Sequence, residues 1–216
     1  MRFFVLEQPR GVGPYTTDYY DWEPVHLGEA PRCPSCGRFV GLLPWLPPYS
    51  AEIEVLGKEF GDIAFGPGCD LLVSARFTNL VREHCLRGFT DFEPVHIVRV
   101  RYRRRAHYQQ VVPSYYHVNV RCTAAAVNQE ASGLQWKRAV ACSDCRQGDH
   151  LIRWKRLVLE EGTWSGEDVF EARGLPASYL VTERFKAICE KAGITNVSFV
   201  PAEEHSRDFY PDGTEP

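Results

Sequence analysis

The amino-acid sequence predicts an α+β protein made of two tandem, divergent repeats, each with a CxxC knuckle, short antiparallel strands and one main helix. Two C-x-x-C pairs, Cys33/Cys36 and Cys142/Cys145, lie 109 residues apart. Landmarks that follow the first pair recur after the second pair at nearly the same offset. In each half, a helical pattern leads into a run of β-branched and aromatic residues, which is typical of a strand.

Composition places the chain among ordinary globular proteins. Its 216 residues are 44% apolar and 25% charged, which excludes wholesale disorder, and the net charge of −3 excludes a uniformly basic nucleic-acid coat. No apolar run reaches the roughly 18 residues of a membrane span. At the N-terminus only four apolar residues, Phe3–Leu6, precede Glu7, too few for a secretory signal. We therefore expect a cytoplasmic protein.

The repeat prediction depends on four matched segments that keep the same order in both halves. The pairs are Leu42–Trp45 with Leu151–Trp154 (109 residues apart), Gly61–Phe65 with Gly166–Phe170 (105), Leu72–Phe77 with Leu180–Phe185 (108) and Gly88–Asp91 with Gly193–Asn196 (105). Four matches in one order indicate a duplication. The boundaries that follow are residues 1–96 for the first repeat and 97–216 for the second, packed as one globular unit.

Local patterns predict the elements of each half. In the first half we expect strands over Arg2–Leu6, Glu52–Leu56 and Phe92–Val100, and a helix over about 70–87. In the second half we expect strands over Arg156–Leu159 and Val197–Val200, and a helix over about 182–192. Apolar residues recur at helical spacing in both helices. In the second helix, Thr182 is a suitable N-cap and Gly193 a suitable left-handed stop.

The eight cysteines indicate a metal site better than a set of disulfides, because disulfide frameworks belong to small secreted chains. A C-x-x-C turn presents two thiolates to one ion, and a closed structural zinc shell needs four. Joining the two pairs gives the candidate ligands Cys33, Cys36, Cys142 and Cys145 for one structural Zn²⁺ shared by the two halves.

Two alternatives remain open for the cysteine pairs. A redox-active dithiol is less favoured, because such pairs lie where a strand joins a helix and strand-like sequence follows each pair here. Separate metal sites would each need further ligands. The candidates for these are His26, His117, Cys122 and His150.

Charge is divided into three blocks. Residues 1–96 carry a net charge of −5, residues 97–156 carry +9 and residues 157–216 carry −7. The basic block contains alternating arginines on one face of a predicted strand, namely Arg99, Arg101, Arg103 and Arg105. They indicate either a patch for an anionic partner such as nucleic acid or, as we favour, a solvated face neutralised by the chain's own carboxylates.

Motifs of catalysis are absent from the sequence. It has no glycine-rich phosphate loop with a lysine, no H-E-x-x-H and no G-x-S-x-G. We therefore expect no enzyme and no small-molecule substrate.

Short motifs spread over nearly the whole chain resemble the double-CxxCG paralogous proteins of myxobacteria. They are the strand Arg2–Leu6, the knuckle Cys33–Gly37, the second knuckle at Cys142 and the run from Asp168 to Ile194. The last run is also similar to the C-terminal part of several bacterial immunity families. One departure is Arg146, which stands where the first knuckle has Gly37, so the second turn is expected to differ in shape.

The resemblance implies an immunity protein, a cytoplasmic antidote that binds a cognate polymorphic toxin delivered by sibling cells. A basic toxin cleft would favour the acidic candidates Glu203, Glu204 and Asp208 as contacts, with Asp212 beyond them; an acidic toxin surface would favour the four arginines. The alternative is a zinc-ribbon-like module that binds nucleic acid, or another zinc-stabilised interaction module.

Overall fold

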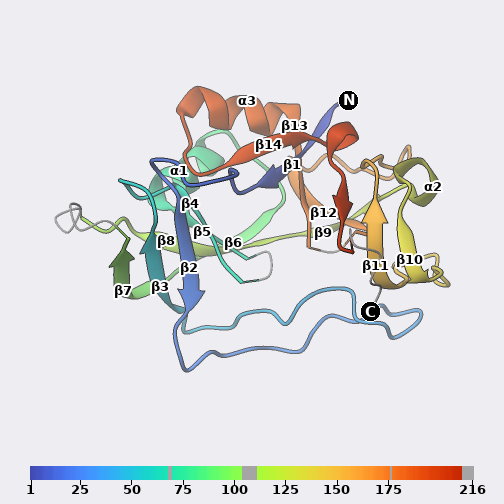
Figure 1. Cartoon of the computed structure of the whole chain (residues 1–216), viewed down its shortest axis with the longest axis horizontal. Coiled ribbons are helices and arrows are strands. Elements are labelled where there is room, and N and C mark those ends of the chain that lie inside the picture. Colours follow the sequence, from blue (N-terminus) through green and yellow to red (C-terminus); the bar gives the residue numbers. More distant parts are fainter. Residues whose placement is uncertain (68–69, 104–110, 176, 211–216) are drawn as a thin grey trace.

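The computed structural model describes residues 1–67, 70–103, 111–175 and 177–210 of the chain. In chain order its elements are β1 (Phe3–Glu7), β2 (Thr17–Asp21), β3 (Ser50–Val55), β4 (Ile63–Phe65), β5 (Leu71–Ser74), α1 (Ala75–Glu83), β6 (Phe89–Pro94), β7 (His96–Tyr102), β8 (Tyr115–Val120), β9 (Cys122–Ala126), α2 (Gln129–Ser132), β10 (Gln135–Arg138), β11 (Asp149–Trp154), β12 (Val169–Arg173), β13 (Tyr179–Thr182), α3 (Glu183–Ala192), β14 (Ser198–Pro201), the 3₁₀ turn η2 (Ala202–Glu204) and β15 (Arg207–Asp208). Figure 1 shows their arrangement.

The chain is mostly β, so the predicted α+β fold class is wrong. Strands take up 39% of the residues and helices 13%, and the strands form three sheets. The hydrophobic periodicity of the sequence led to the wrong prediction because a short, fully buried strand has a continuous apolar run that also fits a helix. Leu71–Ser74 is such a run: it lies inside the helix predicted over 70–87, but it forms β5, and α1 begins only at Ala75. The strand predicted over 156–159 is also wrong, since of these residues only Leu159 forms an isolated bridge.

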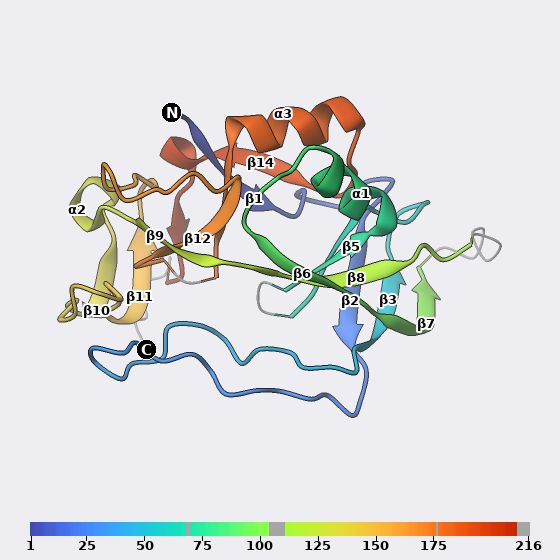
Figure 2. The same cartoon turned by 180° about the vertical axis from the view of Figure 1, so that it is seen from behind.

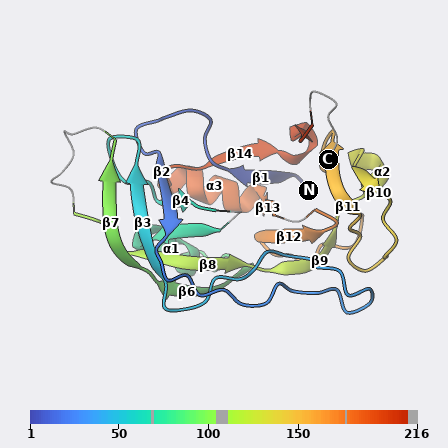
Figure 3. The ribbon, with the colours of Figure 1, turned by 60° about the horizontal axis from the view of Figure 1, so that its bottom comes forward.

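Two of the sheets are large. The first has the order β6-β8-β5-β4-β2-β3-β7 and the second β14-β1-β13-β12-β9, while β10, β11 and β15 form a small third sheet. Figure 3 shows the seven-stranded sheet curling, so that β7 and β3 run in a clearly different direction from β8. Parallel pairs (β2 with β4, β3 with β7 and β9 with β12) interrupt the antiparallel pattern that the sequence predicts.

Neither predicted half is self-contained, because each of the two large sheets contains a strand that comes from the other half. β1 from the N-terminus pairs with β13 and β14, while β8 pairs with β5 and β6, across the boundary at residue 96. The five-stranded sheet nevertheless has the same order and relative strand directions as the run β6-β8-β5-β4-β2 of the larger sheet. Pairings between such distant segments leave no local sequence signal.

The two main helices begin with equivalent caps. The Ser74 side chain accepts from the backbone N–H of Phe77 at the start of α1, and the Thr182 side chain accepts from that of Phe185 at the start of α3. α3 ends at Gly193 in the left-handed conformation, as the sequence predicts. Among the described residues, no helix is long and apolar enough to cross a membrane.

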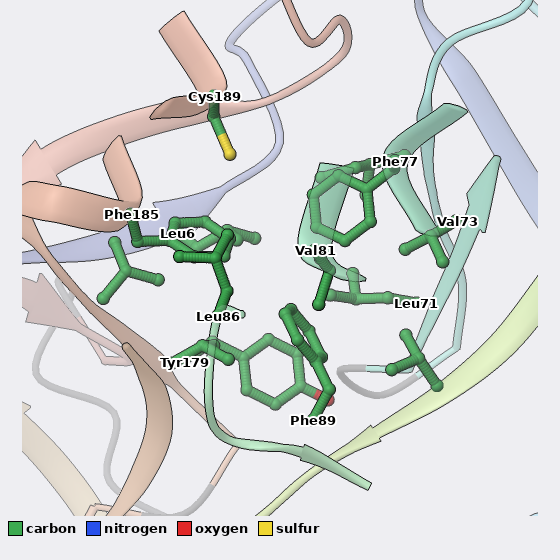
Figure 4. Packing of buried hydrophobic residues seen from close by; sticks show 14 of the residues in the cluster. Leu6, Leu71, Val73, Phe77, Val81, Leu86, Phe89, Tyr179, Phe185 and Cys189 are labelled. Carbon is green, nitrogen blue, oxygen red and sulfur yellow. The ribbon is translucent and has the colours of Figure 1, made fainter. Parts of the chain in front are cut away.

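Three apolar clusters form the core, and alternate residues of one strand serve different clusters. Both helices pack with both large sheets in the first cluster, where Phe77 from α1 and Phe185 from α3 face each other at 6.3 Å between ring centroids (Figure 4). Val181 lies in this cluster, whereas its neighbour Leu180 faces the second cluster behind the five-stranded sheet. The third cluster lies behind the seven-stranded sheet and includes Trp45. Strands buried on both faces explain the continuous apolar runs.

A long excursion between β2 and β3, residues 22–49, is here called the arm. It runs along the molecule from the seven-stranded sheet to the region of β10 and β11 (Figure 2). Its two branches are joined by a bridge between Leu27 and Trp45 and another between Arg32 and Phe39. Trp45 anchors the base, with its ring stacked on Tyr19 at 6.0 Å between centroids. The arm thus carries its tip to a distant part of the chain.

Candidate metal centre

The first cysteine pair occupies the tip of the arm. The turn is closed by two backbone hydrogen bonds, in which the N–H of Cys33 donates to the oxygen of Arg38 and the N–H of Gly37 donates to the oxygen of Cys33, both at 2.8 Å. Gly37 has φ +71°, a left-handed conformation that glycine adopts without strain. The glycine after the second cysteine is therefore explained by the shape of the turn.

The second pair lies between β10 and β11 and forms a similar turn without that glycine. The N–H of Arg146 donates to the oxygen of Cys142 at 3.0 Å, and Arg146 has φ +56°. The expectation that this turn differs in shape is wrong at this residue. A non-glycine residue in this conformation costs about 1–2 kcal/mol, and the Arg146 side chain offsets the cost through a salt bridge with Glu160 and a bond to the Ser143 oxygen.

The structure brings the four cysteines together. The sulfur atoms of Cys33 and Cys142 are 3.8 Å apart, as are those of Cys36 and Cys145, and the four sulfurs all lie within 4.8 Å of one another. A disulfide would place two sulfurs about 2.05 Å apart, so these thiols are not cross-linked.

This geometry fits a tetrahedral metal ion. Sulfurs that each lie about 2.3 Å from a central zinc are about 3.8 Å from one another, which equals the two distances observed between the pairs. Four soft sulfur donors without an oxygen ligand also match the chemistry of structural zinc. The four cysteines could therefore hold a metal ion.

The electrostatic surroundings of the thiols are uneven. Backbone N–H groups of Cys145 and Asp144 donate to the Cys142 sulfur and lower the pKa of this thiol to about 7. Burial raises the pKa of the Cys145 thiol to about 12. A divalent cation at the centre would stabilise both as thiolates, since metal binding displaces the protons.

Polar contacts also join the two turns directly. The Ser35 hydroxyl donates to the Asp144 carboxylate, and the Arg38 guanidinium donates to the Gly148 oxygen at 2.8 Å. These contacts connect the same two loops as the cysteines, so the arm tip is held at several points.

The alternative ligands lie elsewhere. His117 is buried against Tyr49 and Trp45, with ring centroids at 4.7 and 5.3 Å, and neither ring nitrogen has a hydrogen-bond partner among the residues that the structure describes. His26 and His150 are exposed, and Cys122 lines a cavity beside Cys33 and Cys145. In the described part of the chain, the four paired cysteines form the one group of three or more candidate ligands.

Two of the four arginines of the predicted strand are paired with carboxylates of the chain itself. Arg99 and Arg101 on β7 both form salt bridges with the buried carboxylate of Glu52 on β3. Their guanidinium groups also lie over the rings of Trp22 and Tyr20, at 4.9 and 5.4 Å from the ring centroids. Arg103 is exposed at the end of the strand, and Arg105 lies outside the described residues.

The acidic candidates also have cationic neighbours within the chain. Arg2 lies 2.8 Å from a carboxylate oxygen of Glu203 and 3.9 Å from one of Glu204. Arg153 lies 3.7 Å from one of Asp208, and Asp212 lies outside the described residues. Exposed pairs of this kind are weak, so these carboxylates remain accessible.

Sequence patterns did not single out the partly buried carboxyls of Asp70 and Glu171, which line a groove beside the arm. Burial raises the pKa of Asp70 to about 6 and that of Glu171 to about 7. Asp70 directly precedes the apolar strand β5 and Glu171 lies in the middle of β12, so a carboxyl beside or within an apolar strand is the local signal that could have marked them.

Comparison with models of known protein families gives a match. Residues 63–204, about two thirds of the chain, match the model of an immunity protein family, Imm11. No curated protein sequence matches the chain. The expected kinship with toxin immunity proteins is thereby confirmed: the chain belongs to the Imm11 immunity protein family.

Proposed function

We propose that this chain is an immunity protein that binds and neutralises one cognate polymorphic toxin delivered by sibling cells. The family match over residues 63–204 is the observation that carries this proposal. The rigidity of the fold also supports the proposal, because three apolar clusters and the cysteine cluster fix the shape of the surface before a partner binds. The partner is a protein, the site of action is the cytoplasm, and neutralisation occurs by binding, without catalysis.

The proposal is tested by co-expression with the toxin encoded beside this gene. Cells that produce the toxin alone should stop growing, whereas cells that also produce this chain should grow, and the two proteins should co-purify as a one-to-one complex. An unrelated immunity protein from another toxin pair is the control. Absence of both protection and a complex contradicts the proposal.

The cofactor in this proposal is one structural Zn²⁺ held by the thiolates of Cys33, Cys36, Cys142 and Cys145. The 3.8 Å sulfur distances support it. A closed four-sulfur shell leaves no position for water or substrate, so the ion stabilises the fold and performs no chemistry.

A nucleic-acid module is the weaker second candidate. Its support was the arginine strand, but Arg99 and Arg101 are engaged by Glu52, which reduces the charge available for phosphates. A gel shift at low salt distinguishes the two candidates, because binding through phosphates is strongest there.

The division into two related halves, 1–96 and 97–216, also remains a proposal. The matching strand orders of the two large sheets support it. The exchanged strands β1 and β8 mean that two such halves would form a single folding unit.

A further inference from the structure

A groove of about 570 Å³ lies between the arm and the large sheets. One wall comes from the arm, including Phe39, Leu42 and Leu43. The opposite wall comes from the β8–β9 region and β12, including Cys122 and Glu171. A second cavity of about 250 Å³, lined by Cys33 and Cys145, shares Cys122 and Glu171 with the groove, so the hollow extends to the cysteine cluster.

The arm exposes more apolar surface than its surroundings explain. Phe39, Leu42 and Leu43 are 52%, 57% and 51% exposed, and Leu27 and Leu46 of the arm are also exposed. These five are almost half of the large apolar residues that are exposed in the described part of the chain. Large apolar side chains gathered at a groove are typical of an interaction site.

The charged groups of the groove all have one sign. Its charged lining residues are Glu29, Asp70 and Glu171, and no lysine or arginine lines it among the described residues. Arg173 lines the adjoining second cavity, but its guanidinium donates to the backbone oxygens of Ala124 and Asp144. Within that part of the chain, neither the Asp70 nor the Glu171 carboxyl has a side-chain hydrogen bond or an ion pair. Burial and, to a smaller extent, a neighbouring carboxylate raise the pKa of each: Asp21 acts on Asp70, and Asp70 acts on Glu171.

Partly buried carboxyls without a cation are costly in the free protein, and a cation brought by a partner would remove that cost. An apolar side chain beside the cation would bury the exposed arm residues in the same step. A basic group flanked by apolar surface is therefore the chemistry that complements the groove.

We propose that the groove between the arm and β8, β9 and β12 is where the toxin docks, receiving a toxin segment that presents a lysine or arginine beside an apolar or aromatic side chain. This inference rests on the proposed function. The cation lies between Asp70 and Glu171, and the apolar side chain packs on Phe39 and Leu42. The cysteine cluster fixes the arm tip and so holds one wall of the groove in place.

The test measures the affinity of the purified toxin encoded beside this gene. Leu42→Asp, and the double variant Asp70→Asn with Glu171→Gln, should each weaken binding by about 10- to 100-fold, as expected of central contacts. Matched controls lie outside the groove: Val98→Asp alters an exposed apolar residue of β7, and Glu59→Gln an exposed carboxylate. Both should bind within about two-fold of the wild type. Thermal unfolding of each free variant shows whether its fold is retained.

Hydrogen exchange of the wild-type complex gives a second measurement that needs no variant. Residues 39–46 and 117–122 should gain protection when the toxin binds. Absence of protection there, or groove variants that bind like the wild type, overturns the inference while leaving the proposed function intact. If the wild-type chain binds no toxin, the proposed function fails and the inference fails with it. A free dimer that Leu42→Asp dissociates would assign the groove to a second copy of this chain and would also overturn the inference.

Discussion

At the scale of single residues, two buried aspartates join the main helices in equivalent ways. Asp62 accepts from the Ser74 hydroxyl at 2.8 Å and the Arg76 guanidinium at 2.6 Å, and Asp168 accepts from the Arg184 guanidinium at 2.8 Å. Each arginine also reaches the end of the other helix: Arg76 donates to the Gly193 oxygen and Arg184 to the His84 oxygen. Positive charge at a helix C-terminus is favourable.

Asp62→Ala should therefore lower the free energy of unfolding by roughly 3 kcal/mol. It removes the acceptor of several hydrogen bonds and leaves the buried Ser74 hydroxyl and the partly buried donors of Thr195 without this partner. Asp91→Ala, at an exposed position of β6, is the control and should change stability by less than about 0.5 kcal/mol. Urea unfolding measures both, and equal losses would contradict this role of Asp62.

The carboxyls of the groove predict a pH dependence of stability. Burial raises the pKa of Asp70 to about 6 and that of Glu171 to about 7 in the folded chain, above the values of an unfolded chain. Protonation of these two carboxyls therefore stabilises the folded chain relative to the unfolded chain. This contribution to stability is complete below about pH 4 and is lost as pH rises through 6 to 7.

The double variant Asp70→Asn with Glu171→Gln should accordingly be more stable than the wild type at pH 8, on the order of 2 kcal/mol for each site. The difference should shrink toward pH 4. Chemical unfolding across this range is the measurement, and the exposed Glu59→Gln should show no such trend. A stability difference that grows toward acid pH would show that the predicted direction of the pH dependence is wrong.

At the scale of elements, the arm is held by scattered contacts apart from the cysteine cluster. Its branches are joined by isolated bridges, not by a continuous ladder, and its base packs through Trp45. The tip lies against the loop between β10 and β11, so the proposed metal would connect two segments that are far apart in sequence.

Cys33→Ser or Cys142→Ser should lose bound zinc and lower the free energy of unfolding by more than about 3 kcal/mol, because the binding energy of a structural zinc is folding energy. Metal analysis of the purified protein and urea unfolding measure the two effects. Cys85→Ser, at an exposed cysteine outside the cluster, should keep the metal. Wild-type protein that is purified under reducing conditions without any bound zinc would refute the proposed metal.

At the scale of the whole molecule, the exchanged strands make the two halves depend on each other. β1 fills a place between β13 and β14, and β8 fills the equivalent place between β5 and β6. Removing either strand exposes the first apolar cluster, to which both large sheets contribute.

Fragments 1–96 and 97–216 should therefore be unfolded when each is produced alone, since each sheet would lack an inner strand. Mixed or co-expressed, they should associate and regain the far-ultraviolet circular dichroism of the intact chain. A fragment that unfolds cooperatively by itself would show that one half is an independent domain.

Sequence patterns predicted elements whose signals lie within a few residues. Thr182 and Gly193 mark the ends of α3, and the C-x-x-C spacing marks both turns. The patterns gave the wrong element at Leu71–Ser74, where a buried strand imitates a helix. They could not name the partners of the charged candidates Arg99 and Glu203, because Glu52 and Arg2 are far away in the chain.

The sequence by itself thus determined the two ends of α3, the positions of the two cysteine turns and the kinship with immunity proteins, because each is carried by residues that are close together or in a fixed order. Only the tertiary structure decided which strands pair, which charges neutralise one another and where the groove lies. Phe3, for example, pairs with Thr182, and a contact over such a separation is chosen by the burial of apolar surface in the assembled core, which no local pattern records.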